Sequence, residues 1–351
     1  MDTQTKLTGR DGGIDAVKAA AIFCVAALHV TSGALGSAVG SAAWLGAVFW
    51  TCAVRAGVPL FFMCSGALLL PPEKDLPLRR LYGKNLLKLV VAMLVWATGY
   101  KVFHLLAAGA VSAGTLWQAA KEVLVFNQEF HLYYLHILLL VYALLPVTRV
   151  FVRYASEREL RYALTLWFAL GILFPTVRAC WPFTLLTDIP RQWMLNMSWA
   201  AVGYGLLGWY LVKHLPSVKL GAALAAAGFA LVFGPTLGLS LRSGALEERF
   251  LEGMSVGVCL LAAGLFPLLY RAGKALEGRR PGGFVTGISK ASFCIYLVHV
   301  AWLEVFRGLG LTAAAFAPIL SVPLLALAIG AVSWGCWWVL EKVPVVKKWL
   351  I

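Results

Sequence analysis

The chain has 351 residues, of which 61% are hydrophobic and only 13% are charged. The charged share is about half that of a typical soluble domain, which excludes a soluble globular protein and predicts an all-α, polytopic integral membrane protein. A formal net charge of +14 does not indicate a nucleic-acid partner, because no basic cluster interleaved with aromatic residues lies in a soluble segment. Membrane lipids are the surroundings that we expect.

Apolar windows long enough to cross about 30 Å of hydrocarbon recur along the whole chain. They fall at residues 13–36, 42–70, 82–109, 131–151, 160–178, 193–213, 218–240, 250–270, 288–308 and 317–340. About ten transmembrane helices are therefore predicted, and an even number places both termini on the same side of the membrane. With cytoplasmic termini, most of the 30 lysine and arginine residues fall in cytoplasmic segments, in agreement with the positive-inside rule. We expect one membrane-embedded domain, residues 1–351, that crosses the inner (cytoplasmic) membrane several times.

Two ionisable residues lie on the first apolar window, Lys18 and His29. Their separation is about three helical turns, so the two side chains share a face and lie about 16 Å apart along the axis. Ionisable groups within a membrane span are costly and usually face a partner, a cavity or a substrate path. The first helix is therefore predicted to be a functional part of the protein. A buried histidine bonded to a carbonyl of a neighbouring helix is the alternative for His29.

Three cations fall within apolar windows, namely Lys18, Arg55 and Lys88. Counting about 1.5 Å per residue from the cytoplasmic ends puts all three in the inner part of the bilayer and His29 in the outer half. A basic cavity open to the cytoplasm, for a polyanionic cosubstrate, is one interpretation. In the other, Asp15 neutralises Lys18 from one turn away, and Lys88 extends its ammonium group to the interface.

The sequence predicts no metal site and no tightly bound cofactor. The seven cysteines form no CxxC pair and mostly fall in apolar windows, where free thiols serve as small apolar residues. His131 and His136 lie close together in the sequence but lack a carboxylate at ligand spacing.

Five sequence motifs resemble those of the acyltransferase-3 family, membrane O-acyltransferases that modify bacterial glycans. In chain order they are Lys18-x10-His29, Arg55 followed by VPLFFMCSG, KNLLK, HLYYLHILLLVYALLP and ISKASFCIYLVH. Together they extend from the first expected helix to the ninth. The fourth motif is similar to that of short family members, including the type that acetylates enterobacterial common antigen, so no attached extracellular domain is expected. Lysine stands at position 18 where arginine is commoner, and Asn85 with Lys88 stands where the family often has paired arginines.

The resemblance implies acyl transfer from cytoplasmic acyl-CoA, most often acetyl-CoA, to a hydroxyl of a cell-surface or lipid-linked glycan. Acyl-CoA is then a cosubstrate whose phosphates bind to cations, here Lys18, Arg55, Lys84 and Lys88. His29 is expected to be the general base, since a neutral imidazole accepts a proton at working pH. In the alternative mechanism, an acyl-histidine relay, the same residue is the nucleophile.

The remaining candidate residues fall into two groups. Asp15, Ser65, Ser292, Tyr296 and His299 are expected to line the acyl channel, although the last three share a face of one helix and equally suit interhelical hydrogen bonds. Glu129, His131, Tyr134, Arg249 and Glu252 are expected to bind the acceptor sugar, because carbohydrates need polar groups beside aromatic faces. A transporter or flippase also needs charges and a cavity within the membrane, so it is the competing function. The oligomeric state stays open.

Overall fold

The computed structural model describes residues 10–127, 129–180 and 192–351. Every regular element in these ranges is helical, which confirms the predicted all-α fold. Nine helical segments of the described chain are long and apolar enough to cross a membrane. The expected window at 193–213 contains one further helix, α11, of 17 residues (Met197–Lys213). The chain is thus a multi-pass membrane protein.

The helices follow one another through short connections. The first half of the chain forms α1 (Gly12–Leu35), α2 (Ala42–Ala53), α3 (Gly57–Leu69), α4 (Leu78–Arg80), the π-helical turn η1 (Leu81–Leu86), α5 (Leu87–Ala107), α6 (Ala113–Leu124), η2 (Phe130–Leu132), α7 (Tyr133–Tyr154), α8 (Glu157–Phe168), η3 (Ala169–Leu173) and α9 (Phe174–Arg178). The second half forms α11, α12 (Val218–Ser243), η5 (Arg249–Leu251), α13 (Val256–Leu276), α14 (Arg280–Gly308), η6 (Ala313–Ala315), α15 (Pro318–Leu340) and α16 (Pro344–Trp349).

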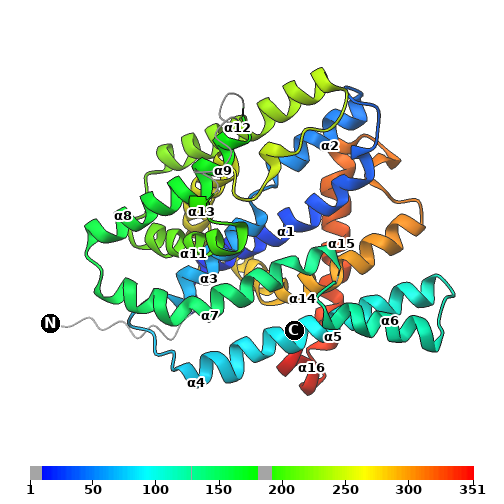
Figure 1. Ribbon diagram of the computed structural model, residues 1–351, viewed down its shortest axis with the longest axis horizontal. Coiled ribbons are helices and arrows are strands. Elements are labelled where there is room, and N and C mark those ends of the chain that lie inside the picture. The colour runs from blue at the N-terminus through cyan, green and yellow to red at the C-terminus, as the bar shows by residue number, and fades with distance from the viewer. Residues whose placement is uncertain (1–9, 128, 181–191) are drawn as a thin grey trace.

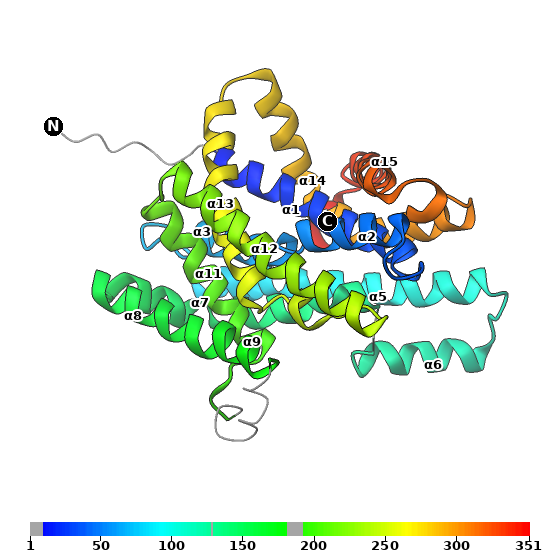
Figure 2. The ribbon, with the colours of Figure 1, turned by 90° about the horizontal axis from the view of Figure 1, so that it is seen from above.

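Helix α1 lies in the interior of the bundle, as Figures 1 and 2 show. Asp11 caps its first turn, because the side chain accepts hydrogen bonds from the backbone N–H groups of Gly13 and Ile14. Helices α2, α3, α13, α14 and α15 all pack against α1. The helix that carries Lys18 and His29 is therefore enclosed by protein on several sides.

The second apolar window, expected to form one continuous helix, is broken near its middle. α2 ends at Ala53 and α3 begins at Gly57, and the turn between them carries Arg55. A Cβ atom on Gly57 would lie 3.0 Å from the Cβ of Cys24 in α1. The turn therefore lies beside the middle of α1, further along that helix than Lys18.

Helices α3 and α11 cross at a contact between their backbones. A Cβ atom on Gly66 would lie 1.8 Å from the Gly205 carbonyl oxygen, and one on Gly208 would lie 2.2 Å from the Met63 carbonyl oxygen. Both distances are far inside van der Waals contact, so only glycine fits at positions 66 and 208. Close approach through small residues is typical of membrane helices, and here it holds α3 against the bundle.

The C-terminal segment folds back onto the start of α5. α16 packs against α5 (Figure 1), and the indole N–H of Trp96 donates a hydrogen bond of 3.1 Å to the Leu350 carbonyl. The ammonium group of Lys88 donates to the Ile351 carbonyl. These contacts place the last described residue beside the cavity that Lys18 lines.

Candidate active site

Two cavities lie one beyond the other along α1. The first, here called the Lys18 cavity, has a volume of about 440 Å³, and its charged lining consists of Lys18, Lys74, Lys88 and Lys290. These lysines come from α1, the loop before α4, α5 and α14. No aspartate or glutamate is among the described residues that line the cavity. A cavity whose charged side chains are all of one sign concentrates counterions, here anions.

The lysines of this cavity differ in how they are held. Lys74 donates a hydrogen bond of 2.8 Å to the Leu68 carbonyl, and Lys88 donates to backbone carbonyls of the C-terminal segment. Partial burial, together with the nearby Arg80 and Arg149 guanidinium groups, lowers the pKa of Lys74 below its ordinary value. Lys18 has no hydrogen-bond or ion-pair partner in the described chain, so its ammonium group is available to a ligand.

The second cavity, here called the His29 cavity, has a volume of about 420 Å³. His29, Thr31 and Ser32 of α1 line it together with Arg55 from the turn between α2 and α3. The Nε–H of Arg55 donates to the Leu251 carbonyl, which anchors the guanidinium at one edge. Within the described ranges Arg55 forms no ion pair, so its other N–H groups are available to an anionic group in the cavity.

Three histidines from separate segments meet beside the His29 cavity. The ring centroid of His29 lies 5.1 Å from that of His299, which in turn lies 5.6 Å from that of His131. His29 and His131 line the cavity, whereas His299 is not among its lining residues and is 1% exposed. In the part of the chain that is described, neither ring nitrogen of His29 has a hydrogen-bond partner. The alternative of a carbonyl-bonded His29 is therefore wrong. The described residues contain no group of three or more His, Cys, Asp or Glu side chains that could hold a metal ion.

An aromatic layer separates the two cavities and consists of Phe61, Phe62, Tyr134 and Tyr296. Tyr134 and Tyr296 line both cavities, and their ring centroids are 5.3 Å apart. Phe61 and Phe62 also contact Tyr134, with ring centroids 6.0 and 5.0 Å from its ring. The hydroxyl of Tyr296 donates to the His131 carbonyl. A path from one cavity to the other thus passes these rings.

The residues expected to bind the donor are not all together. Lys18 and Lys88 line the same cavity. Lys84 is exposed and does not line it. Arg55 lines the His29 cavity instead, so the expectation that it lies at the depth of Lys18 is wrong. The reason is that Arg55 lies 15 residues from residue 70, the cytoplasmic end of its window, which is about 22 Å along a helix and beyond the middle of the bilayer. The turn between α2 and α3 accordingly lies beside the middle of α1.

Of the residues expected along the acyl channel, Ser65, Ser292 and Tyr296 line the Lys18 cavity. His299 lies behind the His29 cavity, and Asp15 faces away from both. Tyr296 also forms a hydrogen bond between segments of the kind that the alternative interpretation expected, whereas Ser292 bonds within its own helix. The Ser292 hydroxyl donates to a carbonyl of its own helix at 2.9 Å, and the Tyr296 hydroxyl bonds to another segment.

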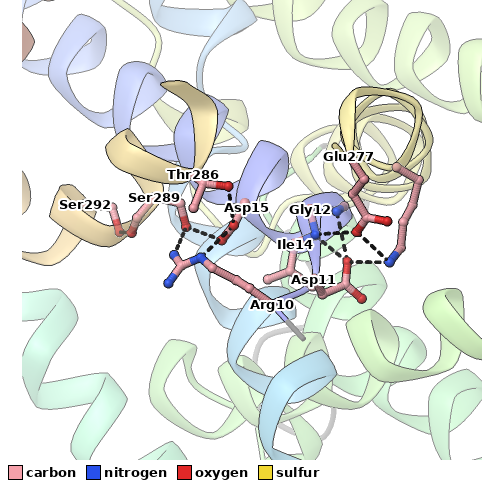
Figure 3. A network of polar contacts seen from close by, with 11 residues as sticks. Arg10, Asp11, Gly12, Ile14, Asp15, Glu277, Thr286, Ser289 and Ser292 are labelled. Carbon is pink, nitrogen blue, oxygen red and sulfur yellow. Dashed lines mark hydrogen bonds and ion pairs between the residues drawn. The ribbon is translucent and has the colours of Figure 1, made fainter. Parts of the chain in front are cut away.

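Asp15 belongs to a polar network that joins α1 to α14, as Figure 3 shows. Its carboxylate accepts hydrogen bonds from Arg10 at 2.6 Å, from Ser289 at 2.7 Å and from Thr286 at 2.9 Å. Asp15 therefore forms no ion pair with Lys18, and it does not line the channel cavities. A second part of the network joins α1 to the end of α13. There the Glu277 carboxylate accepts a hydrogen bond of 2.7 Å from the backbone N–H of Gly12.

The residues expected to bind the acceptor are also divided. His131, Tyr134 and Glu252 line the His29 cavity. Glu129 lies 3.4 Å from His104 and Arg249 pairs with Glu247 at 2.6 Å, and neither lines that cavity. Three of the five residues expected to bind the acceptor thus share the cavity of His29.

The lining residues that the sequence analysis missed include Lys74 and Lys290 in the first cavity and Tyr133 and Glu248 in the second. Lys74 and Lys290 were counted only as charges that orient the chain. Lys290 precedes Ser292 by two residues on the helix that also carries Tyr296 and His299. This proximity was an available signal that Lys290 reaches the cavity. Nothing local marks Glu248, because it reaches the cavity from a connecting segment between α12 and α13.

A family model described as an acyltransferase domain, that of the acyltransferase-3 family, matches residues 11–341. The chain belongs to the acyltransferase-3 family. Both cavities and the histidine cluster fall within the matched residues, apart from Ile351 at the edge of the Lys18 cavity. No curated protein sequence and no solved structure matches the chain. Membership of the acyltransferase-3 family favours a membrane acyltransferase over the competing transporter or flippase.

Proposed function

We propose that this membrane acyltransferase transfers an acyl group, acetyl in the simplest case, from acyl-CoA to a hydroxyl of a cell-surface or lipid-linked glycan. The donor occupies the Lys18 cavity, the acceptor hydroxyl enters the His29 cavity, and His29 is the general base. The Lys18 side of the bundle faces the cytoplasm of a cell whose inner membrane holds the protein. The observation that carries the proposal is a pair of neighbouring cavities in a chain of this family. The charged side chains of one cavity are all lysines, and the other is lined by His29, whose ring forms no hydrogen bond in the described chain.

Charge supports the Lys18 cavity as the donor site. Acyl-CoA carries several phosphate charges at one end and a thioester at the end of a long arm. The four lysines complement the phosphates, and Lys18 forms no bond in the described chain that a ligand must first break. The arm then follows α1 toward His29, over an axial rise of about 16 Å, and passes the aromatic layer on the way.

Acid–base chemistry supports His29 as the base. As the acceptor hydroxyl oxygen attacks the thioester carbonyl carbon, its proton moves to a ring nitrogen of His29. The tetrahedral intermediate then collapses, the carbon–sulfur bond breaks, and the proton passes from His29 to the sulfur of CoA. The products are the acyl ester and free CoA, and His29 returns to its neutral form.

Arg55 supplies a charge in the cavity where this reaction takes place. The carbonyl oxygen of the thioester becomes negative in the tetrahedral intermediate, and N–H donors that are already oriented stabilise it. Because the Leu251 carbonyl holds the Nε–H of Arg55, the guanidinium needs little reorganisation to donate its remaining N–H groups. Arg55 is therefore assigned to the intermediate rather than to the phosphates of the donor.

Separating binding from transfer tests the proposal. The protein, purified into lipid nanodiscs, is titrated with acetyl-CoA and then supplied with radiolabelled acetyl-CoA and glycolipid extracted from host membranes. We expect His29→Ala to bind acetyl-CoA as the wild type does and to lose transfer by about 10²- to 10⁴-fold. Loss of the acyl mass increment on surface glycans of cells that carry His29→Ala is the matching readout in vivo.

His214→Ala is the matched control, because His214 is exposed at the end of α11, pairs with Glu157 and lines neither cavity. It should transfer acyl groups at the wild-type rate. Wild-type transfer by a folded His29→Ala protein contradicts the assignment of the base. Absence of acetyl-CoA binding to the wild type contradicts the assignment of the donor.

A further inference from the structure

His299 of α14 is a buried histidine whose protonation pattern follows from one contact. Its Nδ1 atom lies 2.6 Å from the Tyr296 carbonyl oxygen, and the side chain is 1% exposed. A carbonyl oxygen only accepts hydrogen bonds, so Nδ1 carries the proton and donates it. No carboxylate pairs with His299 in the described chain, and an unpaired buried cation is costly, so the ring is neutral. Its Nε2 atom therefore has a lone pair and no proton.

That lone pair has no partner of its own. Nε2 of His299 is buried and forms no hydrogen bond within the described chain. An unsatisfied buried acceptor is energetically costly, so a neighbouring hydrogen-bond donor is stabilising. The ring of His29 lies 5.1 Å away between centroids and is tilted by 36°. The two rings form no hydrogen bond with each other in the described chain, but at this separation a rotation of the His29 ring brings one of its N–H groups toward the lone pair of His299.

We propose that His299 is the positioning residue of His29. Its Nε2 atom accepts a hydrogen bond from one N–H of His29, directly or through one water, and thereby fixes which His29 nitrogen is protonated. The other nitrogen of His29 then carries no proton, and its lone pair is directed into the cavity. This inference rests on the proposed function, in which that nitrogen takes the proton of the acceptor hydroxyl. His299 itself keeps its Nδ1 proton throughout the reaction.

The arrangement also accounts for the charged state of His29 during the reaction. When His29 has accepted the proton from the acceptor, both of its nitrogens carry hydrogen, and one N–H still points to the lone pair of His299. A neutral acceptor that remains in place stabilises the imidazolium without a change in structure. The second proton then moves to the CoA sulfur, and the bond between the histidines is the one that was present at the start.

His131 is the competing donor to the same lone pair. Its ring lies 5.6 Å from that of His299 at 83°, and both of its ring nitrogens are buried without partners. The only other titratable side chains whose rings contact this cluster in the described chain are Tyr296, which bonds to the His131 carbonyl, and Tyr100, whose hydroxyl donates to the Leu297 carbonyl. The smaller centroid distance favours His29 as the partner.

Two substitutions of similar size test the inference. In His299→Asn the amide ends near the position of Nδ1, so it retains a donor to the Tyr296 carbonyl but does not reach His29. In His299→Gln the amide reaches the position of Nε2 and supplies an acceptor oxygen there. Each variant is assayed in nanodiscs with radiolabelled acetyl-CoA and extracted host glycolipid.

We expect His299→Asn to lower kcat about 10- to 100-fold, with the KM for acetyl-CoA within about twofold of the wild type. His299→Gln should restore kcat at least about tenfold relative to His299→Asn. Equal kcat values for the two variants overturn the inference, as does a loss that appears in KM alone. An equal loss in His131→Phe, together with no rescue by glutamine at position 299, identifies His131 as the partner and also overturns it.

A second measurement keeps the inference testable if the variants do not fold. Wild-type protein with ¹⁵N-labelled histidine should show His29 as a single tautomer, assigned by its loss in His29→Ala, and an equal mixture of tautomers contradicts the positioning role. Failure of this inference can be distinguished from failure of the proposed function. Transfer by His29→Ala contradicts the function itself, whereas an inactive His29→Ala with equal Asn and Gln variants contradicts only the role of His299.

Discussion

Replacement of Lys18 by methionine removes one charge from the Lys18 cavity while it keeps the length and apolar stem of the side chain. The ammonium group of Lys18 has no hydrogen-bond or ion-pair partner in the described chain. The substitution therefore leaves no other protein group unpaired. The interaction that is lost is the one with the donor.

The expected magnitude follows from that isolation. A hydrogen bond to a charged group contributes about 1.5–3 kcal/mol, which corresponds to a rise in the Kd for acetyl-CoA of about 10- to 150-fold. A unit charge pair at about 4 Å, with an effective dielectric constant near 20, has an interaction energy of about 4 kcal/mol. This value is an upper bound, since three further lysines of the cavity hold the same phosphates.

Ligand-dependent stabilisation provides the assay. At an acetyl-CoA concentration of about 100 times the wild-type Kd, the wild type should gain about 2.7 kcal/mol of unfolding free energy. A variant whose Kd is about 100-fold higher then gains only about 0.4 kcal/mol. Titration calorimetry in nanodiscs at constant salt gives the two dissociation constants directly.

Lys84→Met is the matched control, because Lys84 is exposed and does not line the cavity. It removes the same charge and should change the Kd less than about twofold. The reasoning is refuted if Lys18→Met binds acetyl-CoA within twofold of the wild type. Equal losses in the two variants refute it as well, because they indicate an effect of net charge rather than of the cavity.

Four further outcomes are expected. Arg55→Gln should lower kcat about 10²-fold and leave the Kd for acetyl-CoA unchanged, as measured by single-turnover transfer and by calorimetry. A changed Kd with an unchanged kcat would indicate that Arg55 binds the donor instead. Asp15→Ala should lower the unfolding free energy by roughly 2–4 kcal/mol, seen in thermal melts, with the acetyl-CoA Kd of the folded fraction preserved. Gly66→Ala should destabilise the protein by at least about 1–3 kcal/mol, whereas Gly99→Ala, whose added Cβ meets nothing within 4 Å, should stabilise it by about 0.5–1 kcal/mol. Because the pKa of Lys74 is lowered, its positive charge is lost as pH rises through that pKa, so the acetyl-CoA Kd should increase at alkaline pH, and Lys74→Arg should reduce the increase.

The part of the site that lies on one helix was predictable from the sequence. Lys18 and His29 share a face because an α-helix repeats regularly, and the spacing of two residues on one unbroken helix fixes their relation. The two residues line successive cavities along α1. The all-α membrane fold was predictable for a similar reason, since long apolar windows have no other stable form across a bilayer.

Arg55 shows where counting residues fails. A count must start from the cytoplasmic end of the window at residue 70, and from there Arg55 lies about 22 Å along the helix, which is past the middle of the bilayer. The chain also turns between α2 and α3 at this residue. Pro59 within the window was a signal of a helix start, because proline is tolerated in the first turn of a helix. The turn itself depends on packing against α1, which no local pattern records.

Asp15 and the histidine cluster required three-dimensional information. One-turn spacing suggested that Asp15 pairs with Lys18, but Arg10, Thr286 and Ser289 bind the carboxylate instead. His29, His131 and His299 come from α1, η2 and α14. Their convergence depends on how three distant segments pack, and a single sequence does not contain that arrangement.

The aromatic layer between the two cavities also has a consequence for the electrical properties of the membrane. A protein that opens polar cavities along one helix approaches the design of an ion pore. The rings of Phe61, Phe62, Tyr134 and Tyr296 meet at centroid distances of 5.0 to 6.0 Å, and their apolar faces give a hydrated ion no replacement for its water shell. The aromatic layer thus opposes the passage of a hydrated ion from one cavity to the other.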